Sequence, residues 1–368
     1  MSYLASSTHF NNWVFSAEEL ARIRSLQHLK SQRVLRLERE EKQKADAAAS
    51  NNHTEEQVEE KANLQLTPLL EFLSAEQETL LRDFYEEKIQ ESCSAQFLRT
   101  SDKVKCCAVL LFKRFYLSNS VMEFHPKFMV PTAIYVAGKI EEQYISVDTV
   151  ADQLHVDHKF IIGHEMILLE GVRFQLIMYH PFRALLGFMD DFRAFSKQVL
   201  SNDLPATVLQ KLHANSCALL NDMLLTDLPL LHYPAYLALA ALWHVTDEVA
   251  ASSGDKANGL SRADVLGYIQ RSKFSQEQPV DEVNIRLEQI TKAFQELKAA
   301  QVKGDEAVLR RAKQVKQIYK KLKQFHHDSE KKEKKKDKKG DGKKKDKKRK
   351  GDSKDAKKKV KKQKKDKA

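Results

Sequence analysis

The sequence has 368 residues and is 42% hydrophobic, enough for a sizeable core in one large domain or two ordinary ones. Its net charge is +11, but residues 331–368 alone hold 23 Lys and Arg against 7 Asp and Glu, so the rest of the chain carries about −5. No apolar run reaches the ~18 residues of a membrane helix and no signal peptide is visible, so we expect a soluble intracellular protein.

The N-terminal segment contains a clear helix start. Ser16 is a favoured N-cap residue, and Glu19 three residues later completes a capping box. Phe15 and Leu20 occupy the positions of a hydrophobic staple. We therefore predict a helix that runs toward the forties, and a charged, solvated end that frays into a flexible linker over residues 35–63.

A second helix start lies at Ser74, with Gln77 at the capping-box position. From there to about residue 300, apolar residues recur at three- and four-residue spacing, and alternating strand patterns are scarce. Pro126, Pro181 and Pro234 stand at predicted helix starts, where the missing N–H of proline costs little. This part of the chain is therefore predicted to be helical throughout.

An internal repeat appears when the sequence is shifted by 108 residues, because residues 106–139 then align with residues 214–247 without a gap. Each block reads as an apolar helix, a polar turn, a proline (Pro126 or Pro234) and a very apolar helix. The second helix is apolar on nearly all faces, as expected for the centre of a helical bundle. Two duplicated helical bundles fit this pattern better than a solenoid, which needs three or more shorter repeats.

Lys139 stands at the end of the very apolar helix in the first block, and its counterpart in the second block is Asp247. A cation in the last turn of a helix complements the helix dipole, by about 0.3–1 kcal/mol. Glu141 and Glu142 directly behind Lys139 work against that simple explanation. The alternative is that Lys139 has a role at this position in the first block alone.

Glu165 lies in a predicted helix over about residues 158–173, for which Asp157 is a suitable N-cap. The apolar face of this helix is predicted to carry Ile161, Ile162, Leu168, Leu169 and Val172. Glu165 falls on that face, where a carboxylate is costly unless it is paired. Either Lys139 and Glu165 form an internal ion pair, or both reach an apolar surface that a partner covers.

These motifs resemble the cyclin family. The similarity rests on FKRFYL at 112–117, NSVMEFHP at 119–126, AGKIEE at 137–142, and Glu165 followed nine residues later by Phe174. The second block lacks the lysine and the glutamate. WVFSAEELARIR and TDLPLLHYPAYLALAAL make the cyclin H subfamily the closest likeness and the cyclin C subfamily the nearest alternative. The charged insert over about residues 35–63 and the Lys-rich end differ from what we expect in that subfamily.

The resemblance implies an all-α fold with two tandem five-helix cyclin-box repeats, flanking N- and C-terminal helices packed on or beside the first repeat, and a disordered basic tail. The expected domains are 1–66 (N-terminal helix and charged insert), 67–177 (first cyclin box), 178–302 (second cyclin box), 303–328 (C-terminal helix) and 329–368 (Lys-rich tail).

The resemblance also implies a regulatory function without catalysis. Cyclins bind a cyclin-dependent kinase and move its αC helix into the active position. Lys139 and Glu165, with Glu142 as a weaker candidate, would hydrogen-bond to kinase backbone beside that helix. The implied partners are the catalytic subunit of the CDK-activating kinase, a RING-finger assembly factor and transcription factor IIH. The substrates of the bound kinase would be RNA polymerase II C-terminal repeats and the activation segments of other cyclin-dependent kinases.

The tail from residue 331 is too charged to bury a core, so we expect it to be disordered. KKKDKKRK at 343–350 is typical of a nuclear-import signal, which predicts a nuclear protein. So dense a cationic segment would also contact nucleic acid non-specifically and in a salt-dependent way. The tail contains no aromatic residue for base stacking, so we expect no sequence specificity.

Two other classes of function fit the sequence less well. A nucleic-acid-binding helical repeat, like that of general transcription factor IIB, needs a basic face, and the acidic body counts against it. An enzyme is not indicated, because the sequence lacks a P-loop, GxSxG, HExxH and a kinase glycine-rich loop.

No metal or cofactor is predicted either. The cysteines lack zinc or CxxC spacing, and we interpret them as core residues in a reducing compartment: Cys93, Cys106, Cys107 and Cys217. His155, His158 and His164 gather near one predicted helix, but no carboxylate stands at a spacing that suggests a metal site.

Overall fold

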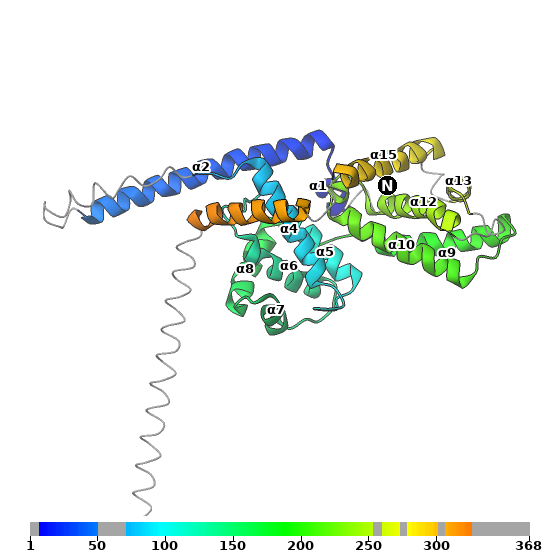
Figure 1. Cartoon of the computed structure of the whole chain (residues 1–368), viewed down its shortest axis with the longest axis horizontal. Helices are drawn as coiled ribbons and strands as arrows, with labels where there is room; N and C mark the ends of the chain where they lie inside the picture. Colours follow the sequence, from blue (N-terminus) through cyan, green and yellow to red (C-terminus); the bar gives the residue numbers. More distant parts are fainter. Residues whose placement is uncertain (1–6, 51–70, 253–259, 273–277, 301–305, 326–368) are drawn as a thin grey trace, which may run out of the picture.

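The computed structural model describes residues 7–50, 71–252, 260–272, 278–300 and 306–325 (Figure 1). Within these ranges the chain forms helices and turns and contains no strand, so the predicted all-α fold is confirmed. None of the described helices is long and apolar enough to cross a membrane. The predicted linker beyond residue 50 and the Lys-rich tail lie outside the described residues.

The N-terminal segment forms a short helix, α1 (Thr8–Trp13), and a long one, α2 (Ala17–Ser50). The predicted capping box is present, because the Glu19 N–H donates to Ser16 Oγ at 3.2 Å and the Ser16 N–H donates to Glu19 Oε2 at 2.9 Å. Leu20 is buried, as expected of a staple residue. Figure 1 shows that the second half of α2 extends away from the rest of the molecule.

The first repeat is a bundle of five helices with α6 at its centre. Its members are α4 (Ala75–Ser92), α5 (Asp102–Phe115), α6 (Pro126–Ile140), α7 (Val147–Leu154) and α8 (His158–Gly171). α6 begins at Pro126 as predicted, buries most of its residues, and packs against the other four. The predicted capping box of Ser74 and Gln77 starts α4.

The second repeat has the same plan around α12. It comprises α9 (Pro181–Val199), α10 (Ala206–Leu224), the single-turn α11 (Leu228–Leu231), α12 (Pro234–Ser252), α13 (Arg262–Arg271) and α15 (Val280–Ala300). The predicted repeat is confirmed, because α10 and α12 stand 108 residues after α5 and α6 and each pair packs together. One hydrophobic core extends through both repeats.

The N-terminal helices join the two repeats. Trp13 Nε1 donates to Gln175 Oε1 at 2.7 Å, at the end of the first repeat. Arg24 donates to both carboxylate oxygens of Asp227 in the second repeat, at 2.5 and 2.6 Å. These contacts fix α1 and α2 across the boundary between the repeats.

A C-terminal helix over residues 306–325 packs beside α4 of the first repeat, as predicted, and Arg311 pairs with Glu87 of α4. Its inner face buries Val315, Ile318 and Leu322. The hydroxyl groups of Tyr319 and Tyr85 hydrogen-bond to each other across this contact. In Figure 1 this is the unlabelled orange helix below α2.

Candidate functional site

Lys139 and Glu165 come together at the surface of the first repeat. Lys139 lies in the last turn of α6 and Glu165 in the middle of α8, and Lys139 Nζ donates to Glu165 Oε1 at 2.6 Å. The Lys139 and Glu165 side chains are 49% and 24% exposed. The two residues therefore form an ion pair with each other, as one alternative predicted, but the pair lies at the surface and not in the interior. Lys139 Nζ also lies 4.3 Å from the centroid of the Tyr135 ring. Partial desolvation disfavours the charged ammonium, but the hydrogen bond and charge of Glu165, together with the contribution of Tyr135, outweigh it and raise the pKa of Lys139.

Apolar side chains lie exposed beside this ion pair. Ile162 is 53% exposed and stands one turn before Glu165 on α8, and Met166, which directly follows Glu165, is 56% exposed. We call Lys139, Ile162, Glu165 and Met166 the α6–α8 surface. The prediction that Ile162 belongs to the buried face of this helix was wrong.

The helical period explains that error. Ile161, Leu168 and Val172 are buried and define the inner stripe of α8, while Leu169 at its edge is partly buried. Ile162 lies about 100° around the helix from Ile161 and therefore faces outward. Glu165 follows the buried Ile161 by one turn, but its side chain is 24% exposed, so its carboxylate reaches solvent.

A tight turn ends α6 directly after Lys139 and Ile140. Gly138 lies so close to this turn that a Cβ there would be 3.0 Å from the Gln143 carbonyl oxygen. The Gln143 N–H donates back to the Gly138 carbonyl oxygen at 3.0 Å, and Glu142 adopts a left-handed backbone with φ of 55°. Glu142 is exposed and makes no described ion pair, so the structure does not place it with Lys139 and Glu165.

Glu141 has a separate role that the sequence did not indicate. Its Oε1 lies 2.7 Å from Nε2 of His180, and the two side chains are 15% and 7% exposed. His180 directly precedes α9, so this contact ties the end of α6 to the start of the second repeat. The two residues are 39 positions apart and belong to different predicted elements, so no local pattern could have paired them.

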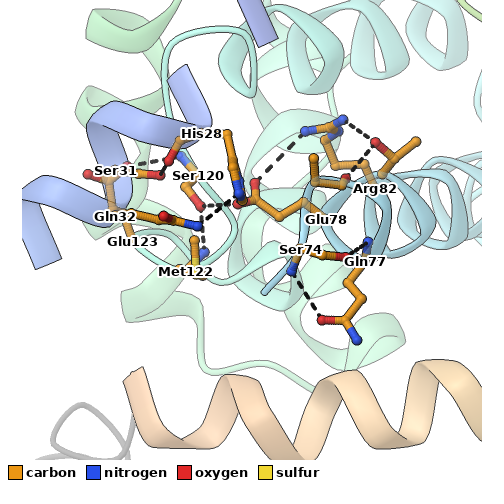
Figure 2. A network of polar contacts seen from close by, with 12 residues as sticks. His28, Ser31, Gln32, Ser74, Gln77, Glu78, Arg82, Ser120, Met122 and Glu123 are labelled. Carbon is orange, nitrogen blue, oxygen red and sulfur yellow. Dashed lines mark hydrogen bonds and ion pairs between the residues drawn. The ribbon is translucent and has the colours of Figure 1, made fainter. Parts of the chain in front are cut away.

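A buried polar network holds α2 against the first repeat (Figure 2). Glu78 is 1% exposed, and one of its oxygens lies 2.8 Å from His28 Nδ1 and accepts from Ser120 Oγ at 3.2 Å. Gln32 Nε2 lies 2.9 Å from His28 Nε2. All contacts are satisfied if Nδ1 of the ring donates to the carboxylate and Nε2 accepts from the Gln32 amide. The network was not predicted, because it joins α2, α4 and the loop after α5.

A buried ion pair joins α4 to α5. Lys113 Nζ is 2.5 Å from Glu86 Oε2, and both side chains are less than 5% exposed. Burial raises the pKa of Glu86 to about 7, although Lys113 opposes that shift. A buried pair of this kind is costly to break on one side only. It therefore holds α4 against α5 and is not available to a partner.

Neither a metal site nor a reactive thiol is evident. The described residues contain no group of three or more side chains that could hold a metal ion. The four cysteines are free, and burial raises the pKa of Cys93 and Cys217 to about 11 and those of Cys106 and Cys107 further. Thiols with such raised pKa values are poor nucleophiles and act here as core side chains.

Comparisons with known proteins agree with this architecture. The sequence profile of the cyclin N-terminal domain matches residues 59–177, and that of the cyclin C-terminal domain matches residues 180–301. Cyclin-H1-1 of Arabidopsis thaliana is 34% identical over 244 residues, which cover 66% of this chain and 70% of that protein.

Two solved structures share the fold. A chain of the CAK complex from Chaetomium thermophilum bound to ATP-γ-S has a TM-score of 0.60 at 24% identity, and the match covers 87% of this chain and 88% of that one. A chain of the yeast TFIIK (Kin28/Ccl1/Tfb3) complex has a TM-score of 0.54 at 22% identity, covering 79% and 99%.

Proposed function

The chain belongs to the cyclin family, and we propose that it is the regulatory subunit that binds and activates the kinase of a CDK-activating complex. Both cyclin domains match in order along the chain, and a relative at 34% identity bears the name Cyclin-H1-1. The likeness to that relative favours the cyclin H subfamily over cyclin C. The function is regulatory, and the catalytic residues belong to the kinase.

The observation that carries this proposal is the exposed Lys139–Glu165 pair. An ion pair this exposed contributes only about 0–1 kcal/mol to folding, so stability gives little reason for it. The pair combines an N–H donor and a carboxylate acceptor with apolar neighbours, Ile162 and Met166. Such a surface suits a partner helix that buries the apolar side chains and presents free backbone groups.

The proposed mechanism follows from that contact. The partner helix is the αC helix of the kinase, and its burial on the α6–α8 surface moves it inward. The αC glutamate then pairs with the lysine that positions ATP, and the activation segment becomes ordered. Glu142 is exposed three residues after Lys139 and would make at most an additional contact.

The proposed assembly extends beyond the kinase. The structural neighbours come from a CAK complex and from TFIIK with Kin28, Ccl1 and Tfb3. By analogy we propose a RING-finger assembly factor as third subunit, association with transcription factor IIH, and phosphorylation of RNA polymerase II and of other cyclin-dependent kinases. Nuclear import and non-specific nucleic-acid contact by residues 331–368 remain proposals that rest on the charge of that segment.

Kinase activation by a double variant, Lys139→Ala with Glu165→Ala, tests the proposal. We expect unchanged circular dichroism, thermal unfolding within about 1 kcal/mol of the parent, and at least a tenfold (about 1.4 kcal/mol) loss in affinity for the kinase. Phosphorylation of an RNA polymerase II repeat peptide should fall accordingly.

Lys211→Ala is the matched control, because Lys211 is an exposed lysine of α10 in the second repeat and belongs to neither α6 nor α8. It should bind and activate the kinase normally. Full activation by the double variant would refute the proposed contact, and a double variant that unfolds would show that the pair is structural.

A further inference from the structure

A cavity of about 500 Å³ lies where the two repeats meet α1. Its walls come from α1, the start of α5, the end of α6, the linker before α9 and the starts of α9 and α12. Cavities of this size at a boundary between domains are common ligand sites. None of the four residues of the α6–α8 surface lines it, so it is a separate feature of the molecule.

The walls of this cavity are aromatic and largely uncharged. The Phe10 ring stacks on Tyr233 with ring centroids 4.5 Å apart and an interplanar angle of 9°. His9 stacks on Tyr179, and its Nδ1 accepts the Tyr179 N–H at 3.0 Å. Burial lowers the pKa of His9 to about 3, so this ring is neutral near pH 7. The cavity therefore suits a bulky apolar side chain.

His180 gives the cavity a specific polar group. Its side chain is 7% exposed, and its Nε2 is engaged by Glu141 at 2.7 Å. Its Nδ1 is buried and has no hydrogen-bond partner among the described residues. In the neutral ring, Nε2–H donates to the carboxylate and Nδ1 is left as an acceptor. A ligand that donates an N–H to this nitrogen would satisfy it, and a peptide backbone supplies such a group.

The charged residues at the rim of the cavity indicate the net charge of its ligand. Lys103 of α5 and Arg183 of α9 line the cavity, are exposed and make no described ion pair. Among the described residues that line it, Glu141 is the only carboxylate, and His180 already engages it. The two unpaired cations come from different repeats, so an acidic segment that crosses the boundary would meet both.

We propose that this cavity binds an acidic linear peptide of a partner protein. One bulky apolar side chain fills the cavity, a backbone N–H is donated to His180 Nδ1, and carboxylates on either side of it pair with Lys103 and Arg183. The inference does not depend on kinase binding through Lys139 and Glu165.

Selection from a library of random short peptides displayed on phage tests the proposal, with the full chain immobilised. Peptides that bind an Ala235→Trp variant are removed first, because a Trp at that wall position fills the cavity. The surviving peptides should share one aromatic or large aliphatic residue flanked by Asp or Glu. A synthetic peptide of the selected sequence should bind Arg183→Glu or Lys103→Glu at least about tenfold more weakly.

Arg193→Glu is the matched control, since Arg193 is exposed on the same helix, α9, but does not line the cavity. It should bind the synthetic peptide like the parent, and all variants should match the parent in circular dichroism. The proposal is overturned if no peptide survives removal on Ala235→Trp, if the survivors lack acidic residues, or if Arg183→Glu binds them unchanged. Binding that appears only after deletion of residues 1–6 would overturn it too, because the chain's own start would then be the occupant.

Discussion

The two repeats have the same helical arrangement but differ in whether charged side chains at equivalent positions are buried. In the first repeat, Lys113 and Arg114 of α5 are 5% and 1% exposed. Their counterparts 108 residues later in α10 are Asn221, which is half-buried, and Asp222, which is exposed and pairs with Lys298 at 2.8 Å. The first repeat thus buries charges where the second repeat has neutral or solvated polar groups.

The same contrast continues at the ends of the central helices. Lys139 pairs with Glu165 across helices α6 and α8 and stays half-exposed. Its counterpart Asp247 instead engages Arg262 of α13 at 2.8 Å, within the second repeat. The two copies therefore differ in a few ionisable residues. In the first repeat these residues form part of an exposed surface, and in the second repeat they pair with each other between helices of that repeat.

The largest expected effect comes from removing one partner of the buried ion pair. Lys113→Ala leaves the Glu86 carboxylate buried without its cation, and we expect a loss of about 3–5 kcal/mol in unfolding free energy. Asn221→Ala at the equivalent position should cost no more than about 1 kcal/mol. Urea unfolding measures both. Equal losses would contradict the contrast between the two repeats.

The pH dependence of unfolding free energy should show how much the buried histidines near each repeat contribute to acid sensitivity. Burial lowers the pKa of His9 from 6.5 to about 3, and that of His232 in the second repeat to about 4. The unfolded chain then binds more protons than the folded chain below pH 6.5, so stability falls as pH drops through this range, by up to about 1.4 kcal/mol per pH unit for each ring.

Urea unfolding between pH 7.5 and pH 4 provides the measurement. His9→Asn and His232→Asn should each flatten the dependence of unfolding free energy on pH, because each removes a buried ring that the unfolded chain protonates more readily. An unaltered slope in both buried-histidine variants would show that other groups carry the acid sensitivity.

The smallest effects on unfolding free energy are expected from the half-exposed ion pairs, and there the effect on kinase activation should differ between the two repeats. Asp247→Ala removes a half-exposed ion pair with Arg262 and should cost about 0–1 kcal/mol, with kinase activation unchanged. Lys139→Ala should cost as little in thermal unfolding but should reduce kinase activation. Loss of activation in Asp247→Ala would mean that both copies contribute to the partner surface.

Local signals predicted the helices well. The capping boxes at Ser16 and Ser74 and the prolines at helix starts act through bonds and sterics within a few residues, so sequence spacing is sufficient to identify them. The repeat was visible because both copies bury the same kind of central helix. Ile162 was misplaced because an apolar residue near the edge of a helical stripe can face either way, and only packing decides.

Lys139 and Glu165 were singled out from sequence because ionisable residues in apolar surroundings need an explanation. Their direct contact and their exposure could not be derived, since they depend on how α6 and α8 cross. The pairing of Glu141 with His180, and that of Glu78 with His28 and Ser120, left no local trace at all. Each joins elements that are distant in the chain.

The sequence by itself determined the all-α class, the helix starts, the duplication and the acidic body with its basic end. These follow from side-chain periodicity, backbone capping and charge, which act over a few residues or simply add up. Only the tertiary structure decided which charges are buried, which reach solvent, and which meet across the boundary between the repeats. The reason is that desolvation and pairing depend on the distance between groups in space, and neighbouring helices set that distance.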